Sequence, residues 1–309
     1  MLFTTYSLFL ATASISFAHP TPYKPAIADV DILQYALALE HLEDKFYREG
    51  LANFTLQHFM EAGFNETFYD NLKEVSYDET THVSFLTSAL KAANATPVAE
   101  CTYSFGVTSV ASFIATASIL EGVGVSAYLG AAASIVNKDY LTAAGSILTI
   151  ESRHSSYLRA AQKQSSFPQA FDAPLGFNEV YTLAAPFITS CPEGNGKLPV
   201  KAFPMLALEA SITNVTTNST IVLDTKGSTL RLPSNSEHVN WYAAWISVTG
   251  PTFTPATLTG NNDMFKTTVP SGFHGQSYVL ITGKKGCMTD DCVIAGPAIV
   301  EVSGANGIM

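Results

Sequence analysis

Four stretches of the chain repeat apolar residues every three or four positions, and each places ionisable side chains on the same stripe. This spacing is typical of helices packed in a bundle, where the stripe faces the core. Burying ionisable groups is costly, so their presence on core-facing stripes needs a physical reason. The stripes are Leu33, Ala36, Glu40, Glu43 and Tyr47; Leu72, Val75, Glu79, His82, Leu86 and Ala89; Ile114, Ala117, Glu121, Gly124, Tyr128 and Ala131; and Ala144, Ile147, Glu151, His154, Leu158 and Ala161.

Aligned on their first shared glutamate, the four stripes reveal an internal repeat. Three residues after that glutamate, the second and fourth stripes carry His82 and His154, whereas the first and third carry Glu43 and Gly124. The alternation predicts two helix pairs related by a pseudo-twofold axis. Few residues around "VNKDY" join the last two helices, with Asp139 as the expected N-cap, so these helices should be antiparallel neighbours. The longer segment "ANATPVAECTYSF" can cross back over the bundle.

The polar residues on the stripes have the pattern of a site for two metal ions. Residues three apart share a helix face, so a Glu-x-x-His pair can hold one ion, and one glutamate from each remaining helix completes a ferritin-like dimetal site. Two divalent cations would neutralise four carboxylates, which explains their burial. One Glu-x-x-His arises easily by chance, but two in register with two further glutamates do not. The predicted ligands are Glu40, Glu79, His82, Glu121, Glu151 and His154.

The ligand types limit the metal. Carboxylates and imidazoles without thiolates suit iron or manganese, and zinc by affinity alone. We therefore expect two metal ions, iron or manganese, forming a redox centre for peroxide or dioxygen.

Three residues near the predicted ligands have two interpretations each. Three residues after the shared glutamate, the first stripe carries Glu43 at the position where the second and fourth stripes carry histidine. Glu43 is therefore either an added ligand or an acid outside the ligand set. Gly124 and Ala117 flank Glu121 with little side-chain volume. They either leave a hollow for dioxygen or peroxide, or let helices pack closely.

Four further residues are expected to have structural roles. Tyr47 and Tyr128 lie two turns from the glutamates of their own helices, about 10 Å away and too far to ligate, so core tyrosines with hydrogen-bond partners are expected. Asp78 and Arg153 adjoin ligands and could orient them, although surface ion pairs are the preferred interpretation.

The stretches "ILQYALALEHLEDKFYREGL", "TASILEGVGVSAYLGAA" and "AAGSILTIESRHSSYLR" resemble the secreted ferritin-like domain family, which includes fungal stress-response and late-sexual-development proteins and plant desiccation-related proteins. For the fungal members the resemblance continues through "SCPEGN" and "GPAIVEV". It implies the fold and a role in stress or development, without supplying a reaction.

The apolar pattern divides the chain into segments. Helical spacing runs from about 28 to 165, and short β-branched and aromatic runs fill 203–309. Between them, 166–202 is predicted to be a linker with a short helix. We expect an α+β multidomain protein, a ferritin-like four-helix bundle followed by a small β-sandwich-like domain. Trp241, Tyr242 and Trp245 could stack on sugars, but an aromatic run in such a domain is more often core.

Several features indicate the secretory pathway. Residues 1–18 have the apolar run and small-residue end of a signal peptide. Four cysteines predict two disulfides, and the sequence does not choose among the three connectivities, although Cys287 and Cys292 bracket a turn that could close locally. The five N-x-S/T sequons are possible glycan sites at Asn53, Asn65, Asn94, Asn214 and Asn218. We expect a secreted, extracellular or cell-wall glycoprotein.

Charge and hydropathy exclude some partners. With 26 acidic against 16 basic residues and a net charge of −10, nucleic acid is not expected as a partner. Residues 107–136 carry one charge and could be a membrane span, but their stripe matches the other three, so a central bundle helix is expected and no membrane span after signal cleavage.

Two functions follow as hypotheses. The first is a secreted dimetal protein that handles peroxide, dioxygen or metal in stress or development, as a catalase-like or metal-oxidising oxidoreductase. The second is a non-enzymatic wall or matrix glycoprotein with a structural metal site, whose β domain binds cell-wall polysaccharide or protein. Iron storage in a closed shell is a weaker third option.

Overall fold

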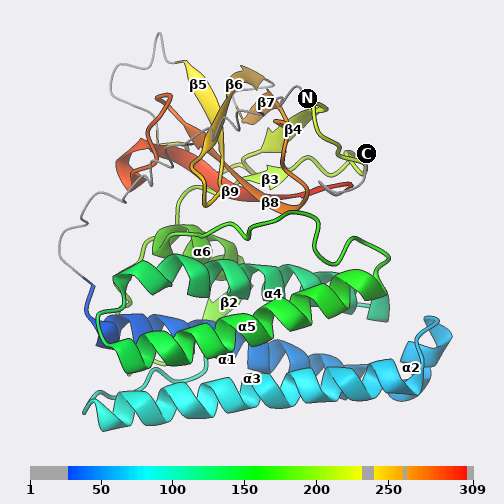
Figure 1. The fold of residues 1–309 in the computed structure, drawn as a ribbon, viewed down its shortest axis with the longest axis vertical. Coiled ribbons are helices and arrows are strands. Elements are labelled where there is room, and N and C mark those ends of the chain that lie inside the picture. Colours follow the sequence, from blue (N-terminus) through cyan, green and yellow to red (C-terminus); the bar gives the residue numbers. More distant parts are fainter. Residues whose placement is uncertain (1–26, 232–239, 260–262, 305–309) are drawn as a thin grey trace, which may run out of the picture.

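The computed structural model describes residues 27–231, 240–259 and 263–304. The predicted signal peptide lies outside these ranges. Two layers are visible in Figure 1: a bundle of long helices below, and a domain of antiparallel strands above it. The fold is therefore α+β, as predicted. The helices are α1 (Asp29–Asn53), α2 (Leu56–Glu61), α3 (Glu66–Ala92), α4 (Val110–Ala131), α5 (Lys138–Ala161) and α6 (Phe177–Ala184).

The four long helices form two closely packed pairs, α1 with α3 and α4 with α5. Helix α4 lies nearest the strands and α3 farthest from them (Figure 1). The short helix α2, which the periodicity did not predict, is folded back on the start of α3 through Phe59, which is fully buried among aromatic rings.

Side-chain caps mark the starts of three long helices, α3, α4 and α5. The Asn65 Oδ1 atom accepts a hydrogen bond from the Phe68 amide at the start of α3, at 2.9 Å. The turn before α5 differs from the prediction: Asn137, and not Asp139, is the N-cap, and its Oδ1 accepts from the Asp139 amide at 2.8 Å. Asp139 instead lies in the first turn, where its negative charge interacts favourably with the positive end of the helix dipole.

The segment joining α3 to α4 crosses the bundle as a long connection, residues 93–109. It carries β1 (Thr102–Tyr103), which pairs with β2 (Ile188–Ser190) after α6. The Cys101–Cys191 disulfide closes the same place, and Cys287–Cys292 forms the second, local disulfide. Two disulfides are typical of proteins in an oxidising compartment.

The strands beyond residue 206 form one seven-stranded sheet in the order β3-β4-β7-β6-β5-β8-β9. Strand β6 pairs with β5 through its first half and with β7 through its second half, so the sheet bends there and encloses a core. Trp245 is fully buried in that core and Trp241 packs against it. The strands are β3 (Ala207–Leu208), β4 (Thr220–Asp224), β5 (Trp241–Trp245), β6 (Thr252–Thr259), β7 (Met264–Thr268), β8 (Gly275–Thr282) and β9 (Val293–Val302).

The bundle and the strand domain share an interface along α4 and α5. The Arg159 guanidinium donates to both carboxylate oxygens of Glu301 on β9, at 2.8 and 3.0 Å. The Tyr278 hydroxyl on β8 donates to the Gly122 carbonyl at 2.8 Å. One apolar cluster contains side chains from α1, α4, α6, β5, β8 and β9.

Helix α4 is apolar on nearly every side because both layers cover it. Within the described part of the chain, the segment Val110–Ser134 is the one helix long and apolar enough to cross a membrane by length and composition. About 67% of its most apolar window is buried inside the protein. That burial is what a central bundle helix requires.

Candidate metal centre

The six residues predicted as ligands converge at mid-height of the bundle from four different helices. Glu40 comes from α1, Glu121 from α4, and a Glu-x-x-His pair from each of α3 and α5. They form two groups whose candidate donor atoms lie within 4.8 Å of one another. The groups are Glu40, Glu79, His82 and Glu151, and Glu79, Glu121 and His154. Glu79 belongs to both groups, so its carboxylate lies between them.

Each imidazole faces glutamates from more than one helix. The Nδ1 atom of His82 lies 3.2 Å from both Glu40 Oε2 and Glu79 Oε2. The Nδ1 atom of His154 lies 3.1 Å from Glu79 Oε1 and 3.2 Å from Glu121 Oε2. Both rings therefore present the same nitrogen to the centre of the bundle.

The four glutamates are almost completely buried, with at most 1% of their surface exposed. Both oxygens of Glu151 have no hydrogen-bond partner within the described residues, and the contact of Glu79 Oε1 with Nδ1 of His154, at 3.1 Å, is the one polar contact that this oxygen makes there. A buried carboxylate without partners is destabilising by several kcal/mol unless it is protonated or bound to a cation. The oxygens without partners can therefore accept a proton or bind a cation.

Burial and mutual repulsion raise the pKa values of these carboxyl groups. Loss of hydration is the largest cause for Glu79, and the nearby charge of Glu121 adds to it; together they raise its pKa to about 7 despite opposing hydrogen bonds from the histidines. The pKa of Glu151 lies well above its ordinary value for the same reasons, burial first and then the charge of Glu79. At neutral pH, protons are held where a cation could replace them.

The histidines respond in the opposite sense. Burial lowers the pKa of His82, but hydrogen bonds and charge from Glu40 and Glu79 outweigh burial and raise it to about 10. Burial also lowers the pKa of His154, while the charge of Glu121 raises it to about 11. A metal ion binding here would displace protons from both rings.

Two tyrosines reach the cluster across the bundle, which the sequence did not predict. The hydroxyl of Tyr47 on α1 donates to Glu121 Oε1 on α4 at 2.5 Å, and that of Tyr128 on α4 donates to Glu40 Oε1 on α1. The prediction considered, for each tyrosine, the distance to the glutamate of its own helix alone. The bonds instead run to the partner helix, because antiparallel packing brings the second turn of one helix level with the glutamate of the other.

Asp78 also has a different role from the surface ion pair that was preferred. Its Oδ2 atom lies 3.2 Å from Nε2 of His154, so it can fix the orientation of that ring. Arg153 is exposed. The position matching Asp78 on the other pair is Ile150, which has no hydrogen-bonding side chain, so the two halves of the cluster are not equivalent.

Glu43, Gly124 and Ala117, which had two interpretations each, lie in different surroundings. Glu43 is buried beside the cluster, and burial, followed by repulsion from Glu79, raises its pKa well above the ordinary value. A Cβ atom at Gly124 would lie 2.5 Å from Oε2 of Glu151 and 3.2 Å from Oε1 of Glu43, so glycine leaves the space these carboxylates occupy. Ala117 is fully buried in the core below and belongs to close helix packing.

Comparison with known proteins agrees with this geometry. Residues 28–164 match the family described as "Ferritin-like domain". The helical domain is similar to ferritin-like domains. This confirms the family resemblance drawn from the sequence. The chain is also similar to "Protein rds1" of Schizosaccharomyces pombe, with 26% identity in an alignment of 338 positions that covers 91% of this chain and 83% of the relative.

The donor set of this ferritin-like domain fits metal ions. It consists of buried carboxylates and imidazoles, and both oxygens of Glu151 have no hydrogen-bond partner within the described residues. Buried groups suitable for metal binding are thus present in the domain.

Proposed function

We propose that the protein holds two iron or manganese ions in this cluster and uses them on dioxygen or peroxide during stress or development. The observation that carries the proposal is the pair of donor groups sharing Glu79, with both buried oxygens of Glu151 left without hydrogen-bond partners among the described residues. Bound there, either metal would supply the redox chemistry that amino-acid side chains lack. The proposed ligands are Glu40, Glu79, His82, Glu121, Glu151 and His154.

The residues around the ligands support the proposal by holding them in place. The hydroxyls of Tyr47 and Tyr128 each donate to one glutamate oxygen, and the second oxygen of each of these carboxylates faces a histidine of the cluster. Asp78 holds the ring of His154 through Nε2, so that Nδ1 faces the cluster. The apolar core around Phe113 and Leu158, both fully buried, keeps water away from one end of it.

We also propose that the protein is secreted and glycosylated. The apolar residues 1–18 and the two disulfides support secretion. All five sequon asparagines are exposed, as glycan attachment requires: Asn53, Asn65, Asn94, Asn214 and Asn218.

Metal analysis of the natively secreted protein tests the proposed centre. We expect about two transition-metal ions per chain, and less than one after His82→Ala, because that change removes an imidazole from the donor set. His58→Ala is the matched control, since His58 is exposed on α2 far from the cluster. Protein purified without chelators that contains no transition metal would refute the proposal, as would equal loss of metal in both variants.

Turnover is a separate measurement. Oxygen evolution from hydrogen peroxide, or consumption of dioxygen, by the metal-loaded protein would support a redox role. Metal binding without either reaction would favour a structural metal site. Binding of cell-wall polysaccharide or protein by the β domain stays a prediction, and Trp245 cannot contribute to it because it lies in the core.

A further inference from the structure

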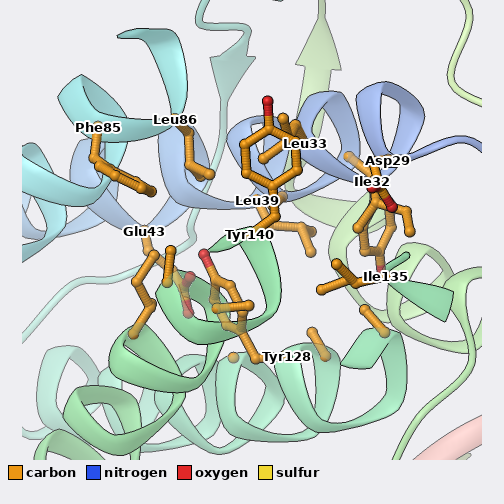
Figure 2. A pocket seen from close by; sticks show the side chains of 18 residues that line it. Asp29, Ile32, Leu33, Leu39, Glu43, Phe85, Leu86, Tyr128, Ile135 and Tyr140 are labelled. Carbon is orange, nitrogen blue, oxygen red and sulfur yellow. The ribbon is translucent and has the colours of Figure 1, made fainter. Parts of the chain in front are cut away.

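An apolar pocket runs along the inside of the bundle and ends at the carboxylate cluster. Side chains from α1, α3, α4 and α5 enclose it, and its cavity volume is about 40 Å³, which is that of a narrow channel. Figure 2 shows Glu43 and the hydroxyl of Tyr128 at one end of the pocket and Ile32 and Ile135 toward the other. We call this space the bundle pocket.

The inner end of the bundle pocket touches the proposed metal centre. Gly124 and Glu43 line it, and both lie beside Glu151. Tyr128, which also lines it, donates to Glu40. A molecule lying in the pocket would therefore have one end next to the cluster.

The lining offers almost no hydrogen bonds to a ligand. Apart from Glu43 and the hydroxyl of Tyr140, its polar side chains have partners within the protein: the carboxylate of Asp29 accepts from the Val136 and Asn137 amides at 2.8 Å, and the hydroxyl of Tyr35 donates to the Phe177 carbonyl. A polar ligand would lose its hydrogen bonds to water without replacing them. The pocket therefore selects apolar molecules.

The pocket is long rather than round. Its lining on α1 extends from Asp29 to Glu43, which at 1.5 Å per residue is about 20 Å along the helix axis. Small residues on the facing helices leave the space open, and they are Gly124, Ala127, Ala131, Ala143 and Ala144. The ring of Phe85, 44% exposed, lines the pocket on α3 and provides apolar surface at an opening.

The lack of polar partners decides which end of a ligand would enter. The lining offers almost no hydrogen bonds to replace those that a carboxylate or phosphate group makes with water, so such a group would remain outside. We propose that the bundle pocket binds an unbranched alkyl chain, such as that of a fatty alcohol, fatty acid or lipid, with its methyl end directed at the cluster. The proposal concerns binding and does not rest on the proposed redox function.

Calorimetric titration of the full-length, chelator-treated protein with linear alcohols from 1-hexanol to 1-decanol tests this proposal. We expect saturable binding whose affinity rises about fourfold per added CH₂ group, the factor expected for burying a methylene. Ala144→Phe should weaken 1-decanol binding at least tenfold by filling the pocket. The matched control is Ala160→Phe, on the exposed face of the same helix, which should bind as the unaltered protein does.

A second variant covers the case in which Ala144→Phe does not fold. Phe85→Ser changes a half-exposed residue and should weaken 1-decanol binding severalfold with an unchanged melting temperature. The proposal is overturned if 1-decanol does not saturate, or if affinity is independent of chain length. It is also overturned if xenon binds but alkanols do not, because the pocket would then admit only small apolar molecules such as dioxygen.

Discussion

Removing metal should make the protein less stable as the pH rises, a trend opposite to ordinary acid denaturation. The pKa of Glu79 is about 7 in the folded protein against 4.5 ordinarily. An acid whose folded pKa is raised leaves stability intact below its unfolded pKa and lowers stability as pH rises through its folded pKa. At about 1.4 kcal/mol per pKa unit, Glu79 alone costs the metal-free protein roughly 3 kcal/mol between pH 4.5 and 8.

The other groups of the cluster act in the same direction. Glu151 and Glu43 also have raised pKa values and add to the loss. The histidines stabilise the fold while protonated, and that contribution, complete below about pH 6.5, disappears as pH approaches about 10. Metal should reverse the trend, because it binds the deprotonated ligands and stabilises the folded state more as pH rises.

Urea unfolding followed by circular dichroism, from pH 4.5 to 8 with and without manganese, measures both trends. Glu79→Gln stays neutral at every pH, so its metal-free form should lose less stability between pH 4.5 and pH 8 than the unaltered protein does. Glu74→Gln, at an exposed position of the same helix, is the control and should follow the unaltered protein. Metal-free protein that is as stable at pH 8 as at pH 5 would refute the reasoning.

Two further substitutions test the surroundings of the cluster. Gly124→Ala should lower metal content by half or more, because its Cβ atom would lie 2.5 Å from Oε2 of Glu151; metal analysis with Gly145→Ala, where no atom lies within 4 Å, as the control measures this. Asp78→Asn should weaken metal binding about tenfold to a hundredfold at the half of the cluster that holds His154, because the ring loses its charged partner. Competition with a chromophoric chelator would show two unequal sites, and two equal sites would contradict the prediction.

The sequence predicted that the six proposed ligands would lie together, because their positions follow from one helical period. In-register glutamates and histidines on four stripes must meet if the stripes meet, so Glu40 and Glu121 could be placed beside the two Glu-x-x-His pairs without knowing any distance. The antiparallel strand domain was predicted equally well, because alternation and turn residues are local signals.

The remaining features depend on how one helix is aligned with another. Tyr47 donates to Glu121, and Tyr128 donates to Glu40, across the interface between α1 and α4. The pattern of one stripe does not specify how far its helix is shifted along the axis of the neighbouring helix. Asp78 directly precedes a ligand, so its proximity was foreseeable, but whether it faces solvent or α5 depends on helix rotation. Helix α2 escaped prediction because six residues are too few to show a period.

Helix α4 carries Glu121 toward the cluster and, on its opposite side, receives Tyr278 and Gln276 from β8 at the carbonyls of Gly122 and Ile119. One helix of 22 residues is thus part of two cores at once. The two halves of the gene cannot be exchanged independently by recombination. A bundle transferred without its strand domain would need a new, polar face on α4 before it could dissolve.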